Sequence, residues 1–318
     1  MDEFALIDRF FARQRIHRPD VRLGIGDDAA VVALAENFEL VIATDTICCG
    51  THFPEATLPD ALGHRCLAVN LSDLAAMGAE PLWSSLALSL PSADPDWLEA
   101  FAAGFFNLAE RFNVGLVGGD TVKGPLAMTV TLHGRVSRGE YITRNGAGPD
   151  ERIYVTGHPG DAGAACRFLS GSDANMAKPP ESLMKRFLFP EPRVNEGMSL
   201  GGIATAMIDI SDGLHDDLAK ILDASGIGAD LEAAKLPLST GLQACVETEQ
   251  ALELALTGGD DYELCFTVPD ERAAAFDKLC AGWGCPVTLI GRTDSEPGIR
   301  WERDGRPYRV PDRSFRHF

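Results

Sequence analysis

Short motifs that place an aspartate beside a glycine-rich turn or after an apolar run recur along this sequence. Five segments share the pattern: Gly24–Asp28, Thr44–Thr46, Asn70–Asp73, Gly118–Thr121 and Asp209–Gly213. Thr257–Asp261 is a candidate sixth. An aspartate at a strand end can point into a crevice with free backbone amides, and adjacent glycines let a phosphate approach the main chain. Carboxylate and hydroxyl oxygens are also the ligands that Mg²⁺ prefers. The pattern predicts a site for phosphates and divalent cations.

Each motif taken singly has a structural alternative, because aspartate also caps helices and stabilises turns. Two positions are more informative than the rest. Asp73 falls in the middle of an expected Ala/Leu-rich helix, where a bare buried charge is costly. Asp45 follows an apolar run. The recurrence of the pattern favours a functional site over separate coincidences.

The common sequence motifs for binding phosphates, dinucleotides or calcium, or for presenting a serine nucleophile, are absent. There is no P-loop motif, no EF-hand loop and no Gly-x-Ser-x-Gly elbow, and Gly24-x-Gly26 lacks the third glycine of a dinucleotide fingerprint. The run His215–Asp217 could form a metal pair, but its amphipathic helical context favours a solvated face.

Alternating strand and helix patterns surround these motifs in the first half of the chain. The predicted elements are a buried strand over 39–44 that ends at Asp45, a helix over 60–78, a helix that starts at Asp94-Pro95, a strand over 114–117 and a strand over 126–136. The strand over 114–117 runs into the Gly118–Thr121 motif, which places that aspartate at a strand end.

A Gly/Pro-rich stretch at 145–150 is the best candidate for a domain boundary. Beyond it the sequence predicts strands over 152–156, 206–210 and 262–268, a helix over 214–224, and a long surface connection over 171–195. Strands and helices alternate in both halves. The fold class expected is α/β with mixed, α+β-like sheets, in two domains.

Composition narrows the choice of partners and compartment. The chain has 28 Lys+Arg and 47 Asp+Glu, a formal net charge of −19, which argues against nucleic acid or an anionic membrane as partner. No apolar run is long enough to span a membrane, and the first residues do not resemble a signal peptide. The eight cysteines form no Cys-x-x-Cys pair, so we expect reduced thiols in the cytoplasm.

Taken together, the motifs are long and specific. They are Gly24–Ala29, Ala43–Thr46, Ala68–Ala79, Val117–Thr121, Ile208–Leu214 and Gly258–Leu264. In this combination, and over nearly the whole chain, the sequence resembles the thiamine-monophosphate kinase family of the aminoimidazole ribonucleotide synthetase superfamily. The resemblance implies an N-terminal α/β domain (1–145) that binds ATP and Mg²⁺ and dimerises through its sheet. It also implies a C-terminal α/β domain (146–318) that completes the active site.

The resemblance also implies a role for individual residues. The implied Mg²⁺ ligands are Asp28, Thr44, Asp45, Asp73, Asp120, Asp209 and Asp212. The implied ATP contacts are Gly119, Asp120, Arg144 and Ser211, and the implied catalytic residues are Asp45, Asp120, Asp212 and Arg144. The implied substrate contacts are His52, Asp260 and Phe315.

Three positions depart from the family pattern. Relatives often carry glutamate where this chain has Asp260, and the shorter acid has less reach. Ala43 replaces a residue that often bears a hydroxyl, so any metal contact there is limited to the backbone. Phe315 can stack on a ring but cannot donate a hydrogen bond.

The reaction implied by the resemblance is transfer of a phosphoryl group from ATP to thiamine monophosphate, directly and in line, with several Mg²⁺ ions. It would be a step in thiamine diphosphate biosynthesis, performed by a homodimer. Two alternatives stay open: another ATP-dependent activation reaction of the same superfamily, and a non-catalytic sensor of nucleotides or divalent cations.

Overall fold

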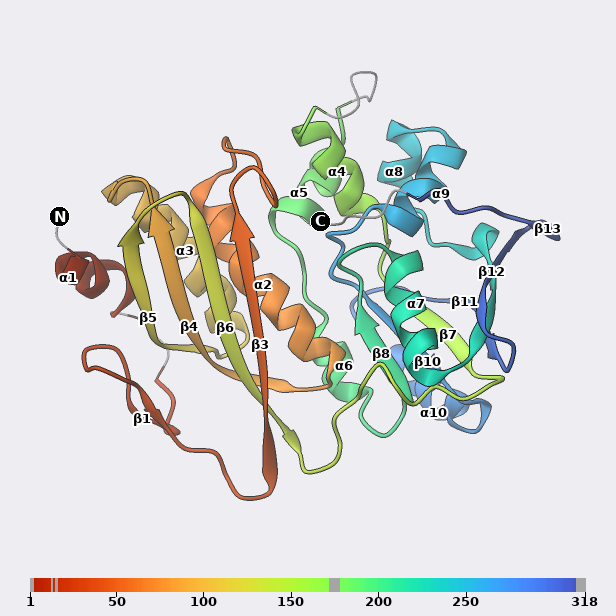
Figure 1. Ribbon diagram of the computed structural model, residues 1–318, viewed down its shortest axis with the longest axis horizontal. Coiled ribbons are helices and arrows are strands. Elements are labelled where there is room, and N and C mark those ends of the chain that lie inside the picture. The colour runs from red at the N-terminus through yellow and green to blue at the C-terminus, as the bar shows by residue number, and fades with distance from the viewer. Residues whose placement is uncertain (1–2, 13, 15–16, 172–177, 313–318) are drawn as a thin grey trace. The chain divides into compact units, whose positions relative to one another are not determined.

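The computed structural model describes residues 3–12, 14, 17–171 and 178–312 (Figure 1). The chain divides into two compact units. The N-terminal unit comprises Met1–Leu74 and Ala79–Gly139, and the C-terminal unit comprises Ala75–Gly78 and Glu140–Phe318. None of the described helices is both long and apolar enough to cross a membrane.

The N-terminal unit is built around a four-stranded sheet. Its elements are α1 (Glu3–Leu6), the π-helical turn η1 (Ile7–Phe11), β1 (Val21–Leu23), β2 (Val31–Val32), β3 (Phe38–Cys48), α2 (Pro59–Ala76, whose last residues belong to the C-terminal unit), β4 (Glu80–Leu90), α3 (Pro95–Arg111), β5 (Gly115–Lys123) and β6 (Ala127–Ser137). The strand order is β3-β6-β4-β5, with β4 and β5 parallel and the other pairs antiparallel. Strands β1 and β2 form a separate two-stranded sheet.

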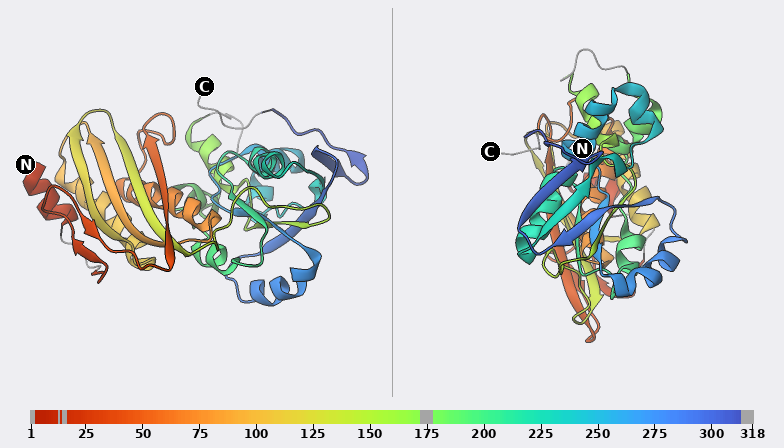
Figure 2. Two further views of the ribbon diagram at one scale, coloured as in Figure 1. Left: turned by 60° about the horizontal axis from the view of Figure 1, so that its bottom comes forward. Right: turned by 90° about the vertical axis from the view of Figure 1, so that its right-hand side faces the viewer.

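Helices α2 and α3 cover one face of the four-stranded sheet (Figures 1 and 2). The two helices approach so closely that their contact requires glycine. A Cβ at Gly63 of α2 would lie 2.0 Å from the Phe101 carbonyl oxygen of α3, and one at Gly104 of α3 would lie 1.9 Å from the Asp60 carbonyl oxygen. The opposite face of the sheet carries the exposed residues Leu40 and Ile42 of β3.

The C-terminal unit is built around a seven-stranded sheet of order β13-β12-β9-β11-β7-β10-β8. Its strands are β7 (Arg152–Thr156), β8 (Ala206–Asp209), β9 (Gly228–Glu232), β10 (Leu264–Val268), β11 (Val287–Asp294), β12 (Gly298–Arg303) and β13 (Arg306–Pro307). Its helices are α4 (Asp161–Leu169), α5 (Glu181–Leu188), α6 (Val194–Ser199), α7 (Leu214–Ser225), the short η2 (Ala233–Lys235), α8 (Thr240–Cys245), α9 (Thr248–Thr257) and α10 (Asp270–Cys280). Among the strands that the structure describes in this unit, only β9 and β12 pair in parallel.

Both faces of the central strands β7 and β10 are buried. On one face Val155 and Cys265 belong to a core that also contains Leu218 of α7 and Leu256 of α9. On the other face Tyr154 and Phe266 stack, with ring centroids 5.7 Å apart, and both pack against Phe276 of α10. Strands buried on both faces account for the nearly continuous apolar runs of the sequence.

The mixed α/β architecture confirms the expected fold class. Three local predictions need correction. Strands β3 and β5 continue through Thr44–Thr46 and Gly118–Thr121, so Asp45 and Asp120 lie within strands, because β6 and β4 supply partners for these residues. The connection predicted over 171–195 contains α5, whose Leu183 and Phe187 are buried.

Candidate functional site

A cavity of about 730 Å³ opens in the N-terminal unit beside the sequence-predicted phosphate motifs. The loop 24–30 and the strand segment 116–121 form much of its wall, with Trp83 and Ser85 of β4 and His133 of β6. Among the expected site residues, Asp28, Gly119 and Asp120 line this cavity. The structure thus brings together two aspartates that are distant in the sequence.

The strand register decides which side chains share a face with Asp120. Asp120 pairs with Ala87, Ala87 with Thr129, and Thr129 with Thr46, so these residues project from the same face. Thr44 lies two residues from Thr46 and shares that face, where its hydroxyl donates to Thr131 Oγ1 (3.0 Å). This face, which also carries Leu40 and Ile42 and is called the open face below, therefore places a row of hydroxyl oxygens beside the Asp120 carboxylate.

Asp45 projects from the other face, towards α2. Its two neighbours in β3 are exposed whereas Asp45 is half-buried, and its backbone N–H donates to Asn70 Oδ1 of α2 (3.2 Å). Asp73, also half-buried, follows Asn70 by three residues on α2. The strand alternation therefore separates Asp45 from the face that carries Asp120.

Gly119 allows β5 to pass close to its neighbour at the cavity wall. A Cβ at this position would lie 1.9 Å from the Leu86 carbonyl oxygen of β4, whereas one at Gly118 would meet no atom within 4 Å. Gly119 is therefore fixed by backbone packing, and Gly118 leaves open space beside Asp120. This open backbone is suited to the close approach of a phosphate group.

His52 lies in the loop that follows β3. The Cys48 backbone N–H donates to His52 Nδ1 (3.0 Å), and the His52 N–H donates to the Cys48 carbonyl (3.0 Å). Because Nδ1 acts as an acceptor, the neutral ring carries its proton on Nε2. His52 is half-buried.

The C-terminal unit holds the second aspartate motif in a tight turn after β8. Asp217 of α7 is fully buried, and its Oδ2 accepts from the backbone N–H groups of Ser211 (3.0 Å), Asp212 (3.0 Å) and Gly213 (3.2 Å). Asp217 is thus a structural anchor, and the prediction of a solvated face for His215–Asp217 is wrong at this residue. The sequence pattern did not indicate this role, because the anchored backbone groups lie four to six residues away.

Lys220 of α7 connects Asp212 to this anchor. Its Nζ lies 2.6 Å from Asp212 Oδ2 and 2.7 Å from Asp217 Oδ1. Burial lowers the pKa of Lys220, but the hydrogen bonds to the two carboxylates outweigh burial and raise it. Burial raises the pKa of Asp217, and the contact with Lys220 opposes this shift. Asp212 is therefore held by a fixed cation, a contact that the sequence motif did not reveal.

The other expected residues of this unit occupy different environments. Asp209 ends β8 and is buried, and Asp260 is half-buried in the segment before β10. Arg144 is exposed, and its carbonyl accepts from Ser225 Oγ (3.2 Å). Phe315 lies outside the residues that the structure describes.

The donor chemistry at the cavity fits Mg²⁺. Asp28 and Asp120 are exposed carboxylates on one cavity, and Ser85 adds a hydroxyl oxygen to its lining. Mg²⁺ is usually held by one or two carboxylates together with phosphate oxygens and water. In the described part of the chain, no group of three histidine, cysteine, aspartate or glutamate side chains is arranged to hold a metal ion by itself. Such a site therefore needs oxygens from a bound phosphate.

Comparison with known protein families matches both halves of the chain. Residues 26–136 match the N-terminal domain of AIR synthase related proteins, and residues 148–302 match the C-terminal domain of the same family. The cavity wall formed by loop 24–30 and segment 116–121 falls largely within the first match, and the Asp209–Gly213 turn falls within the second.

Individual relatives match over their full length. The chain is 46% identical to thiamine-monophosphate kinase of Escherichia coli K12, over 99% of this chain and 98% of that protein. It is 32% identical to the Bacillus subtilis enzyme of the same name over the whole of both chains. Two solved structures are similar: thiamine-monophosphate kinase of Stenotrophomonas maltophilia (44% identity, TM-score 0.87, covering 97% and 98%) and AaThiL complexed with AMPPCP and TMP (29% identity, TM-score 0.77, covering 99% and 97%).

Proposed function

The chain belongs to the thiamine-monophosphate kinase family, and from this premise we propose that it transfers the γ-phosphoryl group of ATP to thiamine monophosphate. The products are ADP and thiamine diphosphate. The observation that carries the proposal is the full-length match together with the cavity that Asp28 and Gly118–Thr121 line. The solved complex of a relative with AMPPCP and TMP supports the same pair of substrates.

The acceptor in this reaction needs no protein base. Phosphate monoesters have a second pKa of about 6, so the attacking phosphate oxygen is largely ionised at neutral pH. The difficulty is to bring two polyanions into line, because like charges repel. We therefore assign this chain's residues to binding, orientation and charge compensation, with direct transfer and no phosphoenzyme.

The N-terminal unit would hold the phosphates at the open backbone beside Gly118 and Gly119. Asp28, Thr44, Asp45, Asp73, Asp120, Asp209 and Asp212 are the residues that would hold Mg²⁺. Bound Mg²⁺ supplies positive charge that neutralises and orients the phosphate oxygens. Arg144, exposed and on a loop, would add a fixed cation, and Ser211 would contact the nucleotide.

The substrate contacts of this proposal come from three positions. His52 would offer its Nε2–H, and the Asp260 carboxylate would accept a hydrogen bond from the organic part of the substrate. Phe315 would stack on a ring. In this scheme the domain 1–145 binds ATP and Mg²⁺, and the domain 146–318 completes the site.

The open face of the four-stranded sheet supports a homodimer. Leu40, Ile42 and Val122 project from this face and are 45%, 56% and 51% exposed. A second copy would bury these apolar side chains, which favours association. Replacing Ile42 with aspartate should shift the protein towards the monomer in sedimentation equilibrium, and an unchanged mass would remove this support.

We also place the protein in the cytoplasm, because all eight cysteines are free thiols.

The test is to incubate the protein with ATP, Mg²⁺ and thiamine monophosphate and to identify products by chromatography. Thiamine diphosphate that forms only when all three are present supports the proposal. ATP binding without product would instead favour a nucleotide sensor.

Asp45→Asn should lower turnover severely while the variant stays folded by circular dichroism, and wild-type turnover would refute the role of Asp45.

A further inference from the structure

The segment that carries Asp260 packs directly on the turn that carries Asp212. The Asp260 N–H donates to the Ser211 carbonyl (2.8 Å), and the Tyr262 N–H donates to the Ile210 carbonyl (2.8 Å). A Cβ at Gly259, whose φ is +67°, would lie 2.7 Å from the Ser211 carbonyl oxygen. The two turns therefore form one backbone platform within the C-terminal unit.

Two residues of this segment adopt the left-handed backbone conformation without being glycine. Asp260 has a φ of 61° and Tyr262 a φ of 50°. Aspartate visits this region more readily than most residues, but the region is unusual for a bulky side chain such as tyrosine. Strain of this kind persists only where surrounding contacts hold it, and it concentrates at functional sites.

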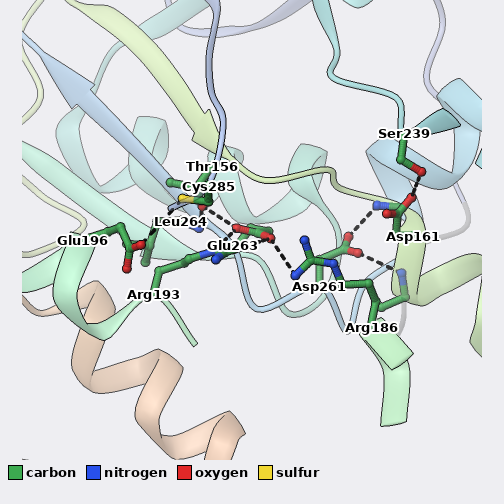
Figure 3. A network of polar contacts seen from close by, with 12 residues as sticks. Thr156, Asp161, Arg186, Arg193, Glu196, Ser239, Asp261, Glu263, Leu264 and Cys285 are labelled. Carbon is green, nitrogen blue, oxygen red and sulfur yellow. Dashed lines mark hydrogen bonds and ion pairs between the residues drawn. The ribbon is translucent and has the colours of Figure 1, made fainter. Parts of the chain in front are cut away.

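Asp261, between these two residues, anchors the segment to a helix. Its carboxylate accepts from the backbone N–H groups of Gly160 (2.7 Å) and Ala162 (3.2 Å) at the start of α4 (Figure 3). Asp261 is 9% exposed. An anchored middle residue prevents the strained segment from relaxing.

Tyr262 reaches the carboxylate of Asp260 with its hydroxyl. Its hydroxyl donates to Asp260 Oδ1 (3.0 Å), and Tyr262 is only 8% exposed. A ring held in the core cannot follow a moving carboxylate, so this bond fixes the orientation of Asp260. The orientation matters because the aspartate side chain is short, so a misdirected Asp260 carboxylate could not extend to a bound ligand as a glutamate could.

We propose that Tyr262 is a positioning residue for thiamine monophosphate recognition, and that it acts through the carboxylate of Asp260. This inference rests on the proposed function, because it takes Asp260 as a substrate contact. Tyr262 orients the Asp260 carboxylate before the substrate binds. Substrate binding therefore does not have to immobilise this side chain, and less conformational entropy is lost on binding. ATP recognition does not depend on this hydrogen bond.

Tyr262→Phe tests the inference because it removes one hydroxyl and keeps the ring. The matched control is Tyr154→Phe, which removes the hydroxyl of another buried tyrosine in the aromatic cluster of the same unit. We expect Tyr262→Phe to raise the KM and the Kd for thiamine monophosphate about tenfold, or about 1.4 kcal/mol. The KM for ATP and the kcat should change by less than about twofold, which separates positioning from general damage.

Calorimetric titration with thiamine monophosphate, without ATP, distinguishes the possible failures. Wild-type protein that does not bind the compound overturns the proposed function and this inference with it. Wild-type protein that binds, with an unchanged Kd in Tyr262→Phe, overturns the inference alone. In an Asp260→Ala background, Tyr262→Phe should have no further effect on the Kd, and an additive loss would show that Tyr262 does not act through Asp260.

Discussion

Removal of Arg193 from its buried ion pair should destabilise the C-terminal unit strongly. Arg193 Nε and Nη2 donate to the two carboxylate oxygens of Glu263 at 2.6 and 2.5 Å, and Thr156 Oγ1 donates to Glu263 Oε2 at 2.6 Å (Figure 3). The side chains of Arg193 and Glu263 are 10% and 3% exposed. Arg193→Met would leave the buried Glu263 carboxylate with the Arg186 guanidinium at 3.9 Å, which is too far for a hydrogen bond.

The expected loss is about 3–5 kcal/mol, the usual cost of breaking a buried pair from one side. The matched control is Arg292→Met, which breaks the surface ion pair between Arg292 and Asp270. Their side chains are 44% and 55% exposed, respectively. That variant should lose at most about 1 kcal/mol. The double variant Arg193→Met/Glu263→Met should lose less than Arg193→Met, because no buried charge is left unpaired.

Urea denaturation followed by circular dichroism measures these losses as free energies of unfolding. Acidification provides an independent check. Burial alone would raise the pKa of Glu263, but the hydrogen bonds and charge of Arg193 lower it below 4.5. The pair therefore stabilises the protein above that pH, and its contribution is lost as the pH falls through the lowered pKa. Equal losses in the Arg193→Met and Arg292→Met variants would show that the buried pair does not stabilise the unit more than the surface pair does.

Three further predictions concern Gly119, Asp261 and Lys220. Gly119→Ala should lower the free energy of unfolding by about 1–3 kcal/mol, because the new Cβ would collide with the Leu86 carbonyl oxygen. The control Gly118→Ala should leave thermal unfolding unchanged, because a Cβ there meets no atom within 4 Å. Equal effects of the two substitutions would contradict this prediction. Burial raises the pKa of Asp261 above its ordinary value of 3.8. The contribution of Asp261 to stability is therefore complete below pH 3.8 and is lost as the pH rises through the raised pKa. Urea titrations should therefore show Asp261→Asn gaining stability relative to wild type as the pH rises, and parallel pH curves would exclude this. Lys220→Met should weaken Mn²⁺ binding in calorimetry, because Asp212 loses the contact that holds it, and unchanged binding would show that Lys220 does not position Asp212.

The parts of the fold that the sequence predicted best carry local signals. Asp94 accepts from the backbone N–H groups of Asp96 and Trp97, and Pro95 occupies the first helical position, as the predicted helix start requires. The alternation over 126–136 matches β6 within one residue at each end. These features depend on residues that are neighbours in the chain.

Strand limits and buried contacts depend on distant residues, so they could not be predicted in this way. Strand β5 passes through Gly118–Thr121 because β4 pairs with it, and no local pattern announces that partner. Arg193 and Glu263 are 70 positions apart. Asp217 is close to its turn in sequence, but its helical context concealed that its side chain points back to the backbone.

For the site itself, the aspartate motifs identified Asp28 and Asp120, which the cavity unites. The same motifs placed Asp45 at a strand end, but it lies within β3 on the face towards α2. A one-residue difference in a strand reverses the face, so motif spacing alone cannot decide it.

We propose above that this chain moves the γ-phosphoryl group of ATP to thiamine monophosphate. Incubation with ATP labelled with ³²P at the γ-phosphate tests it directly, with products separated by chromatography. We predict that label appears in thiamine diphosphate, and only when Mg²⁺ and thiamine monophosphate are both present. Label that appears solely as inorganic phosphate, or stays in ATP, would contradict the claim.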